Sequence, residues 1–90
     1  MDKIPFVTQE ELKLAREIEK KLLALPPMAG ILFVSVETSP LPSQTFFSIF
    51  IGCDWSIEAE TCSALAKEVL KDLLKEKFYQ IEARRGLKKI

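Results

Sequence analysis

The sequence predicts a small two-layer α+β domain of the order α-β-β-α, with a candidate third strand near the C-terminus. Three observations lead to this prediction. Two segments have apolar residues at helical spacing, the two segments between them are rich in β-branched and aromatic residues, and a proline-containing stretch separates these two. We therefore expect an antiparallel β-hairpin packed under two helices. Ninety residues correspond to one domain, so residues 1–90 are treated as a single domain.

The first predicted helix covers about residues 9–24. Thr8 and Glu11 have the spacing of a capping box, in which each side chain bonds the other residue's backbone N–H. The apolar residues recur every three or four positions and form one stripe: Leu12, Leu14, Ala15, Ile18, Leu22 and Leu25. A Pro-Pro dipeptide then ends the helix. Residues 1–7 contain a proline and are expected to form an extended arm.

Residues 30–38 and 45–53 are the two predicted strands, because they are rich in β-formers and too short for independent helices. Residues 38–44 contain two prolines and predict a stiff loop between them. Alternation predicts one apolar face under the helices: Leu32, Val34, Val36, Phe47, Ile49 and Ile51. The opposite face is mixed and holds Ile31, Phe33, Ser35, Glu37, Phe46, Ser48 and Phe50.

The second predicted helix begins where Asp54 or Ser56 can cap it, and its apolar stripe continues through Leu73. Residues 78–85 fit two structures, since they alternate like a strand and also continue the helical stripe. A single helix from Ser56 to Arg85 would be about 45 Å long, which is awkward in so small a domain. A third strand is therefore favoured over a longer helix.

This order of elements is a ferredoxin-like arrangement without its first strand. It is similar to that of the cytoplasmic domains of cation-efflux transporters and of some KH-like RNA-binding folds. The resemblance spans most of the chain but is topological, and two family features are missing. The sequence has no histidine to match the metal-binding histidines of the transporter domains, and it has no Gly-x-x-Gly loop. The resemblance therefore implies an arrangement of elements and assigns no family.

The composition argues against catalysis and against metal or cofactor binding. Without histidine, the usual Ser-His and Cys-His nucleophile pairs and the mixed Cys/His zinc sites are excluded. The two cysteines, Cys53 and Cys62, are too few for a four-thiolate site, and we expect reduced, half-buried thiols. Acidic pairs occur on predicted exposed helix turns, where dipole and capping effects account for them. We expect a protein that is not an enzyme and has no cofactor.

The charge balance narrows the choice of partners. Lysine plus arginine and aspartate plus glutamate both number 13, so the chain lacks the basic excess of a duplex-binding protein. A chain without net charge also lacks self-repulsion, which favours association. No signal-peptide pattern and no apolar run of membrane-spanning length occurs, so the expected location is the cytoplasm, without membrane contact.

The mixed sheet face is the main candidate site. Its candidate interface residues are Phe33, Phe46, Phe50 and Ile31. The leading hypothesis is a non-enzymatic interaction or regulatory module that forms a homodimer, or binds another protein, through this face or a sheet edge. Alternatively, the N-terminal arm or C-terminal tail covers the face.

The second hypothesis is a small RNA- or single-stranded-DNA-binding domain whose phenylalanines stack on bases. The candidate anion contacts for this function are Arg84, Arg85, Lys88 and Lys89. Residues 86–90 are expected to form a basic tail. Against this hypothesis, neither strand of the hairpin carries lysine or arginine, and Glu37 would repel phosphate.

Overall fold

The computed structural model describes residues 7–42 and 44–86. The helices are α1 (Gln9–Leu23), the short 3-10 helix η1 (Pro27–Ala29) and α2 (Ala59–Leu70), and the strands are β1 (Ile31–Pro40), β2 (Thr45–Cys53) and β3 (Phe78–Arg85). The predicted α+β order is confirmed, and residues 78–85 form the strand rather than a continued helix. Most of the predicted arm and basic tail lies outside the described residues. No helix within the described ranges is long and apolar enough to cross a membrane.

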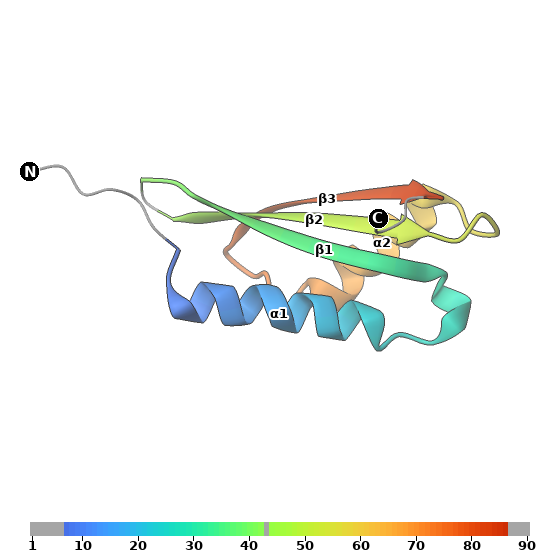
Figure 1. The fold of residues 1–90 in the computed structure, drawn as a ribbon, viewed down its shortest axis with the longest axis horizontal. Coiled ribbons are helices and arrows are strands. Elements are labelled where there is room, and N and C mark those ends of the chain that lie inside the picture. Colours follow the sequence, from blue (N-terminus) through green and yellow to red (C-terminus); the bar gives the residue numbers. More distant parts are fainter. Residues whose placement is uncertain (1–6, 43, 87–90) are drawn as a thin grey trace, which may run out of the picture.

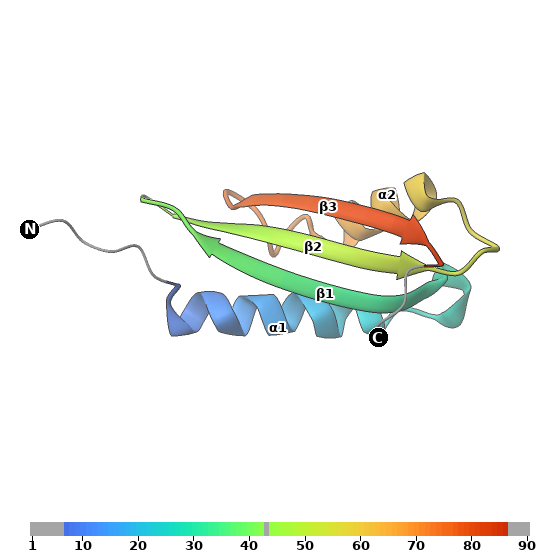
Figure 2. The same ribbon diagram turned by 45° about the horizontal axis from the view of Figure 1, so that its top comes forward.

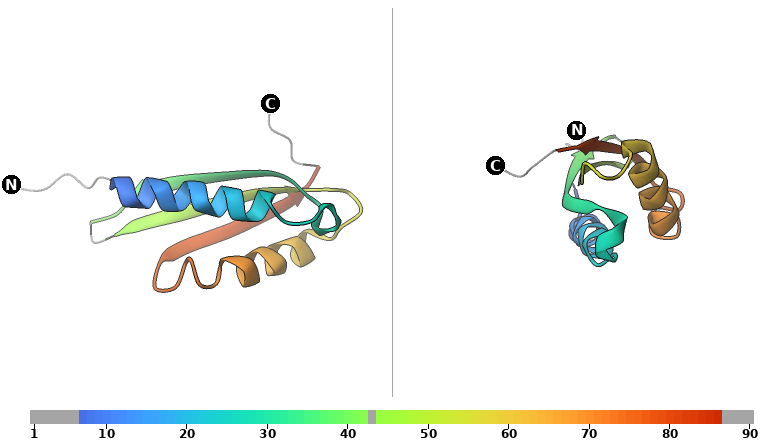
Figure 3. Two further views of the ribbon diagram at one scale, coloured as in Figure 1. Left: turned by 90° about the horizontal axis from the view of Figure 1, so that it is seen from below. Right: turned by 90° about the vertical axis from the view of Figure 1, so that its right-hand side faces the viewer.

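The three strands form one sheet in the order β1-β2-β3, with β2 in the middle (Figure 2). β1 and β2 pair antiparallel, which confirms the hairpin, whereas β2 and β3 pair parallel. A parallel pair needs a crossover connection, and α2 supplies it. Both helices lie on the same side of the sheet (Figures 1 and 3).

The hairpin connection is tighter than predicted. β1 continues to Pro40, which pairs with Thr45, so only residues 41–44 connect the strands rather than 38–44. Leu41 and Gln44 close this turn, and the Leu41 N–H donates to the Gln44 carbonyl at 2.7 Å. Pro40 is tolerated because it lies at the end of an edge strand, where its missing N–H breaks no ladder bond in the sheet interior.

The core lies between the helices and one sheet face. α1 contributes Ala15, Ile18 and Leu22, α2 contributes Cys62, Ala66 and Leu70, and the strands contribute Val34, Phe47, Ile49, Ile51 and Cys53. These helix positions recur at three- and four-residue spacing and the strand positions alternate, as the two periodicities require. Most of the predicted sheet core is therefore confirmed.

The start of β1 departs from simple alternation. Ile31 pairs with Cys53 and Phe33 with Gly52, so an extra residue of β1 stands between two consecutive partners on β2. This β-bulge reverses the alternation at the residues before it. Leu32, predicted to lie under the helices, is 60% exposed, and Ile31, predicted on the mixed face, packs against the core. Both assignments were wrong for this one reason.

Candidate interaction surface on the sheet

The face of the sheet turned away from the helices carries the side chains that alternate with the core positions. The strand register arranges them in four rows across β1, β2 and β3. From the hairpin end these rows are Ser39-Phe46-Phe78, Glu37-Ser48-Gln80, Ser35-Phe50-Glu82 and Phe33-Gly52-Arg84. We call these residues the open face, because no described helix or strand covers it (Figure 3).

The open face gathers three of the four predicted interface residues. Phe33, Phe46 and Phe50 lie on it and are half-buried, whereas Ile31 belongs to the core side because of the bulge. A fourth phenylalanine, Phe78, lies beside Phe46 and is 53% exposed. The sequence alone does not place Phe78 on this surface, because the direction and register of β3 cannot be read from local patterns.

The charged side chains of the open face are two carboxylates and one guanidinium. Glu82 and Arg84, neighbours along β3, form an ion pair with an N–O distance of 3.0 Å. Glu37 is exposed on the β1 edge. A shallow hollow of about 350 Å³ opens among them and is lined by Phe33, Ser35, Glu37, Phe50, Glu82 and Arg84. The open face is thus aromatic and polar, and the Arg84 guanidinium on it is paired with Glu82.

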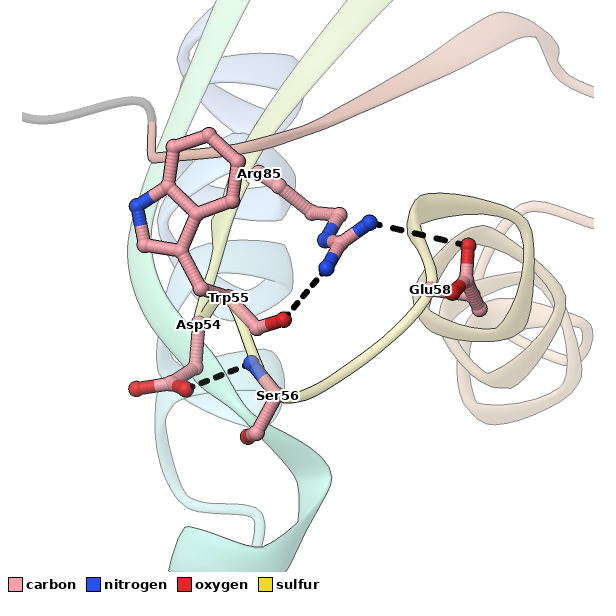
Figure 4. A network of polar contacts seen from close by, with 5 residues as sticks. All are labelled: Asp54, Trp55, Ser56, Glu58 and Arg85. Atoms are coloured by element: carbon pink, nitrogen blue, oxygen red, sulfur yellow. Dashed lines mark hydrogen bonds and ion pairs between the residues drawn. The ribbon is translucent and has the colours of Figure 1, made fainter.

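The two arginines predicted to contact anions do not form one patch. They are consecutive in β3, so Arg84 lies on the open face while Arg85 lies on the helix side of the sheet. The Arg85 guanidinium carbon is 5.4 Å from the Trp55 ring centroid, and the same group donates to the Trp55 carbonyl. It also lies 3.8 Å from a Glu58 carboxylate oxygen (Figure 4). The predicted contacts Lys88 and Lys89 lie outside the described residues.

The segment between β2 and α2 explains where Trp55 lies. The Asp54 carboxylate accepts a hydrogen bond from the Ser56 N–H at 2.9 Å and closes a turn (Figure 4). This bond lowers the pKa of Asp54 from its ordinary value. α2 begins later than predicted, at Ala59, and neither Asp54 nor Ser56 caps it. The Trp55 side chain, 68% exposed, is therefore carried on a turn.

The two cysteines are more buried than predicted, since the side chains of Cys53 and Cys62 are both inaccessible to solvent. Burial raises the pKa of the Cys62 thiol to about 12, and a hydrogen bond with Cys53 adds to this effect. A thiol with such a pKa stays protonated near neutral pH, so it is a poor nucleophile. Within residues 7–42 and 44–86 no cluster of three or more His, Cys, Asp or Glu side chains could hold a metal ion.

A second hollow of about 340 Å³ lies on the helix side, between η1 and α2. Its lining is almost entirely apolar: Leu25, Pro26, Met28, Ala29, Ile57, Thr61, Cys62 and Leu65. Met28 at its edge is 85% exposed. The lining contains no acidic or basic side chain, so this hollow is uncharged at neutral pH.

Comparison with known proteins identifies the fold. No family model matches the chain, and no curated protein matches it in sequence. A histidine-to-glutamate variant of the MamM C-terminal domain has a TM-score of 0.65 and 13% identity, with 89% of this chain and 100% of that chain covered. A valine-to-arginine variant of MamM has a TM-score of 0.64 and 13% identity over 88% and 99% of the two chains. The chain shares the fold of these domains. At such low identity the likeness establishes the fold and nothing of the function.

Proposed function

We propose that this chain is a non-enzymatic interaction or regulatory module that forms a homodimer through the open face or an edge of its sheet. One observation carries the proposal. Four phenylalanines, Phe33, Phe46, Phe50 and Phe78, lie on a sheet face that no described element covers. Apolar area exposed to water is costly, and aromatic side chains are typical anchors of interfaces.

Two further features support association between copies of the chain. The formal net charge is zero, so two copies do not repel each other over long distances. Helices cover only one face of the three-stranded sheet, so the sheet of a second copy can pack on the other face. Stacked sheets lie about 10 Å apart. The fold likeness adds only that this arrangement of elements serves in MamM as a C-terminal domain.

The single-stranded nucleic-acid hypothesis has less support. Arg84 is paired with Glu82, Arg85 lies on the other side of the sheet, and Glu37 adds a second carboxylate to the open face. A backbone phosphate would meet repulsion on this surface. Fluorescence titration with single-stranded oligonucleotides at low salt tests the hypothesis, and flat titrations would remove it.

Multi-angle light scattering tests the proposed homodimer. We expect a mass of twice the chain's 10.2 kDa at low and at high salt. Phe50→Asp places a charge at the centre of the open face and should give a monomer. The matched control is Met28→Asp, which puts the same charge on an exposed apolar position of the helix side and should leave the dimer intact. A wild-type monomer at high concentration would overturn the proposal.

A further inference from the structure

The open face is complementary to itself in one orientation. We propose that two copies pack face to face about a twofold axis that runs across the strands and passes over β2 between Ser48 and Phe50. Each strand then lies antiparallel to the same strand of the other copy. This inference rests on the proposed homodimer and specifies which surface forms it and in what geometry.

In this orientation, large side chains of one copy face small side chains of the other. The rotation exchanges the first row of the open face with the fourth, and the second with the third. Along β2, Phe46 then faces the partner's Gly52, and Phe50 faces the partner's Ser48. Along β1, Phe33 faces the partner's Ser39. Each phenylalanine of these two strands therefore meets a small residue, as close packing between two sheets requires.

The polar and charged residues are also matched in this orientation. Arg84 faces the partner's Phe78, where a guanidinium can stack on the ring while it keeps its ion pair with Glu82. Glu82 faces the partner's Gln80, which can donate a hydrogen bond from its amide. Glu37 faces the partner's Ser35, which can donate from its hydroxyl. No carboxylate faces another carboxylate, so burying them leaves none without a donor.

The hollow on the open face lies where this packing needs space. Its lining residues belong to the second, third and fourth rows: Phe33, Ser35, Glu37, Phe50, Glu82 and Arg84. The twofold rotation brings the third, second and first rows of the partner opposite them. Side chains of the second copy therefore fill the hollow, and symmetry provides two such sites in the dimer.

The competing arrangements fit less well. A twofold axis parallel to the strands would stack Phe46 on the partner's Phe46 and Ser48 on the partner's Ser48. Large residues would then meet large ones and small residues small ones, which leaves clashes and voids along the centre. Edge-to-edge pairing through β1 is hindered by the bulge at Leu32 and by Pro40.

Cross-linking with a short bis-maleimide distinguishes the two axes. Ser39→Cys chains are mixed with affinity-tagged Phe33→Cys chains, and in a parallel mixture with tagged Phe78→Cys chains. In each mixture one of the two variants replaces a phenylalanine by cysteine, so both mixtures lose the same amount of aromatic surface. We expect several-fold more mixed product with Phe33→Cys, because the axis across the strands brings residue 39 opposite residue 33. Wild-type chains are the control, since their own cysteines are fully buried.

Each outcome has a defined meaning. Mixed product mainly with Phe78→Cys would overturn the geometry in favour of the axis parallel to the strands. Product in neither mixture, while light scattering still reports dimers, would overturn the face-to-face contact and leave an edge-paired homodimer. A wild-type monomer would remove the proposed function itself. If loss of a phenylalanine dissociates the dimer, the test is repeated with variants that keep all four phenylalanines. Gln80→Cys chains are mixed with Glu82→Cys chains, which cross-link if the axis runs across the strands. In a parallel mixture they are combined with Glu37→Cys chains, which cross-link if the axis runs parallel to the strands.

Discussion

Cys62 and Gly86 both owe their properties to neighbours that the folded chain brings against them. Cys62 is buried away from water and hydrogen-bonded to Cys53, and both effects favour the neutral form of its thiol. Gly86 follows β3 with a positive φ of 76° and lies directly against the Trp55 ring. Neither property can be read from the residue type alone.

The buried thiol predicts a loss of stability at high pH. Burial raises the pKa of Cys62 from about 9 in the unfolded chain to about 12 in the folded one. Between these values the unfolded state binds fewer protons, so the free energy of unfolding falls as pH rises, by at most about 1.4 kcal/mol per pH unit. Urea unfolding of the wild type and of Cys62→Ala across this range measures it. An equal decline in both proteins would show that Cys62 is not the cause.

Gly86→Ala tests the close contact with Trp55. An added Cβ would lie 2.6 Å from the Trp55 Cζ2 atom, and the positive φ is unfavourable for alanine by about 1–2 kcal/mol. We expect a clear drop in the thermal midpoint. In the Trp55→Ala background the steric part disappears, so the same change should cost less. Equal costs in both backgrounds would contradict the contact.

At the scale of elements, the start of α1 is held both by its own capping box and by a contact with β2. Thr8 and Glu11 form the predicted capping box, with the Glu11 N–H donating to the Thr8 hydroxyl at 3.2 Å. A hydrogen bond from Thr45 and that from Thr8 lower the pKa of Glu11. The stability from this carboxylate is present above its ordinary pKa and is lost as pH falls through the lowered value.

Thr8→Ala should remove the cap and destabilise the protein by about 1 kcal/mol, because an N–H at the start of α1 loses its acceptor. Urea unfolding measures the change. Thr61→Ala, at an exposed position inside α2, is the matched control and should change stability by less than about 0.5 kcal/mol. Equal effects of both substitutions would mean that the capping box does not stabilise α1.

The bulge in β1 predicts that substitutions at Leu32 and Val34 differ in their cost to stability. Leu32→Ala should cost less than about 0.5 kcal/mol, because Leu32 is exposed, whereas Val34→Ala should cost about 2 kcal/mol, because Val34 is buried. Unfolding of the two variants side by side measures the difference. Unbroken alternation predicts similar costs, so a large effect at Leu32 would argue against the bulge.

At the scale of the whole molecule, two helices cover one sheet face and leave the other open. β3 lies parallel to β2 only because α2 carries the chain back along the sheet. This placement brings Phe78 and Arg84 beside the hairpin's phenylalanines and completes the open face. The interface therefore depends on contacts between segments far apart in the sequence.

A dimer through this face predicts that stability depends on protein concentration. The thermal midpoint of the wild type should rise as concentration increases, because only the folded state associates. In Phe50→Asp the midpoint should not change with concentration. Differential scanning calorimetry over a dilution series measures both proteins. A wild-type midpoint that is independent of concentration would argue against a dimer coupled to folding.

The sequence alone determined the two helices, the hairpin between them and most of their apolar positions. Helical spacing identified the α1 stripe, alternation identified most of the core positions of β1 and β2, and Thr8 with Glu11 marked the start of α1. These signals are local, since they depend on residues a few positions apart. Three of the four predicted interface residues followed from the same alternation.

Only the tertiary structure decided the rest, because it depends on pairing between distant segments. The bulge moved Ile31 and Leu32 to opposite sides, and the register of β3 brought Phe78 to the open face and separated Arg84 from Arg85. A one-residue shift in pairing turns every side chain of a strand to the other face. The composition of a surface therefore depends on register, and register is set by the packing of the whole sheet against its helices.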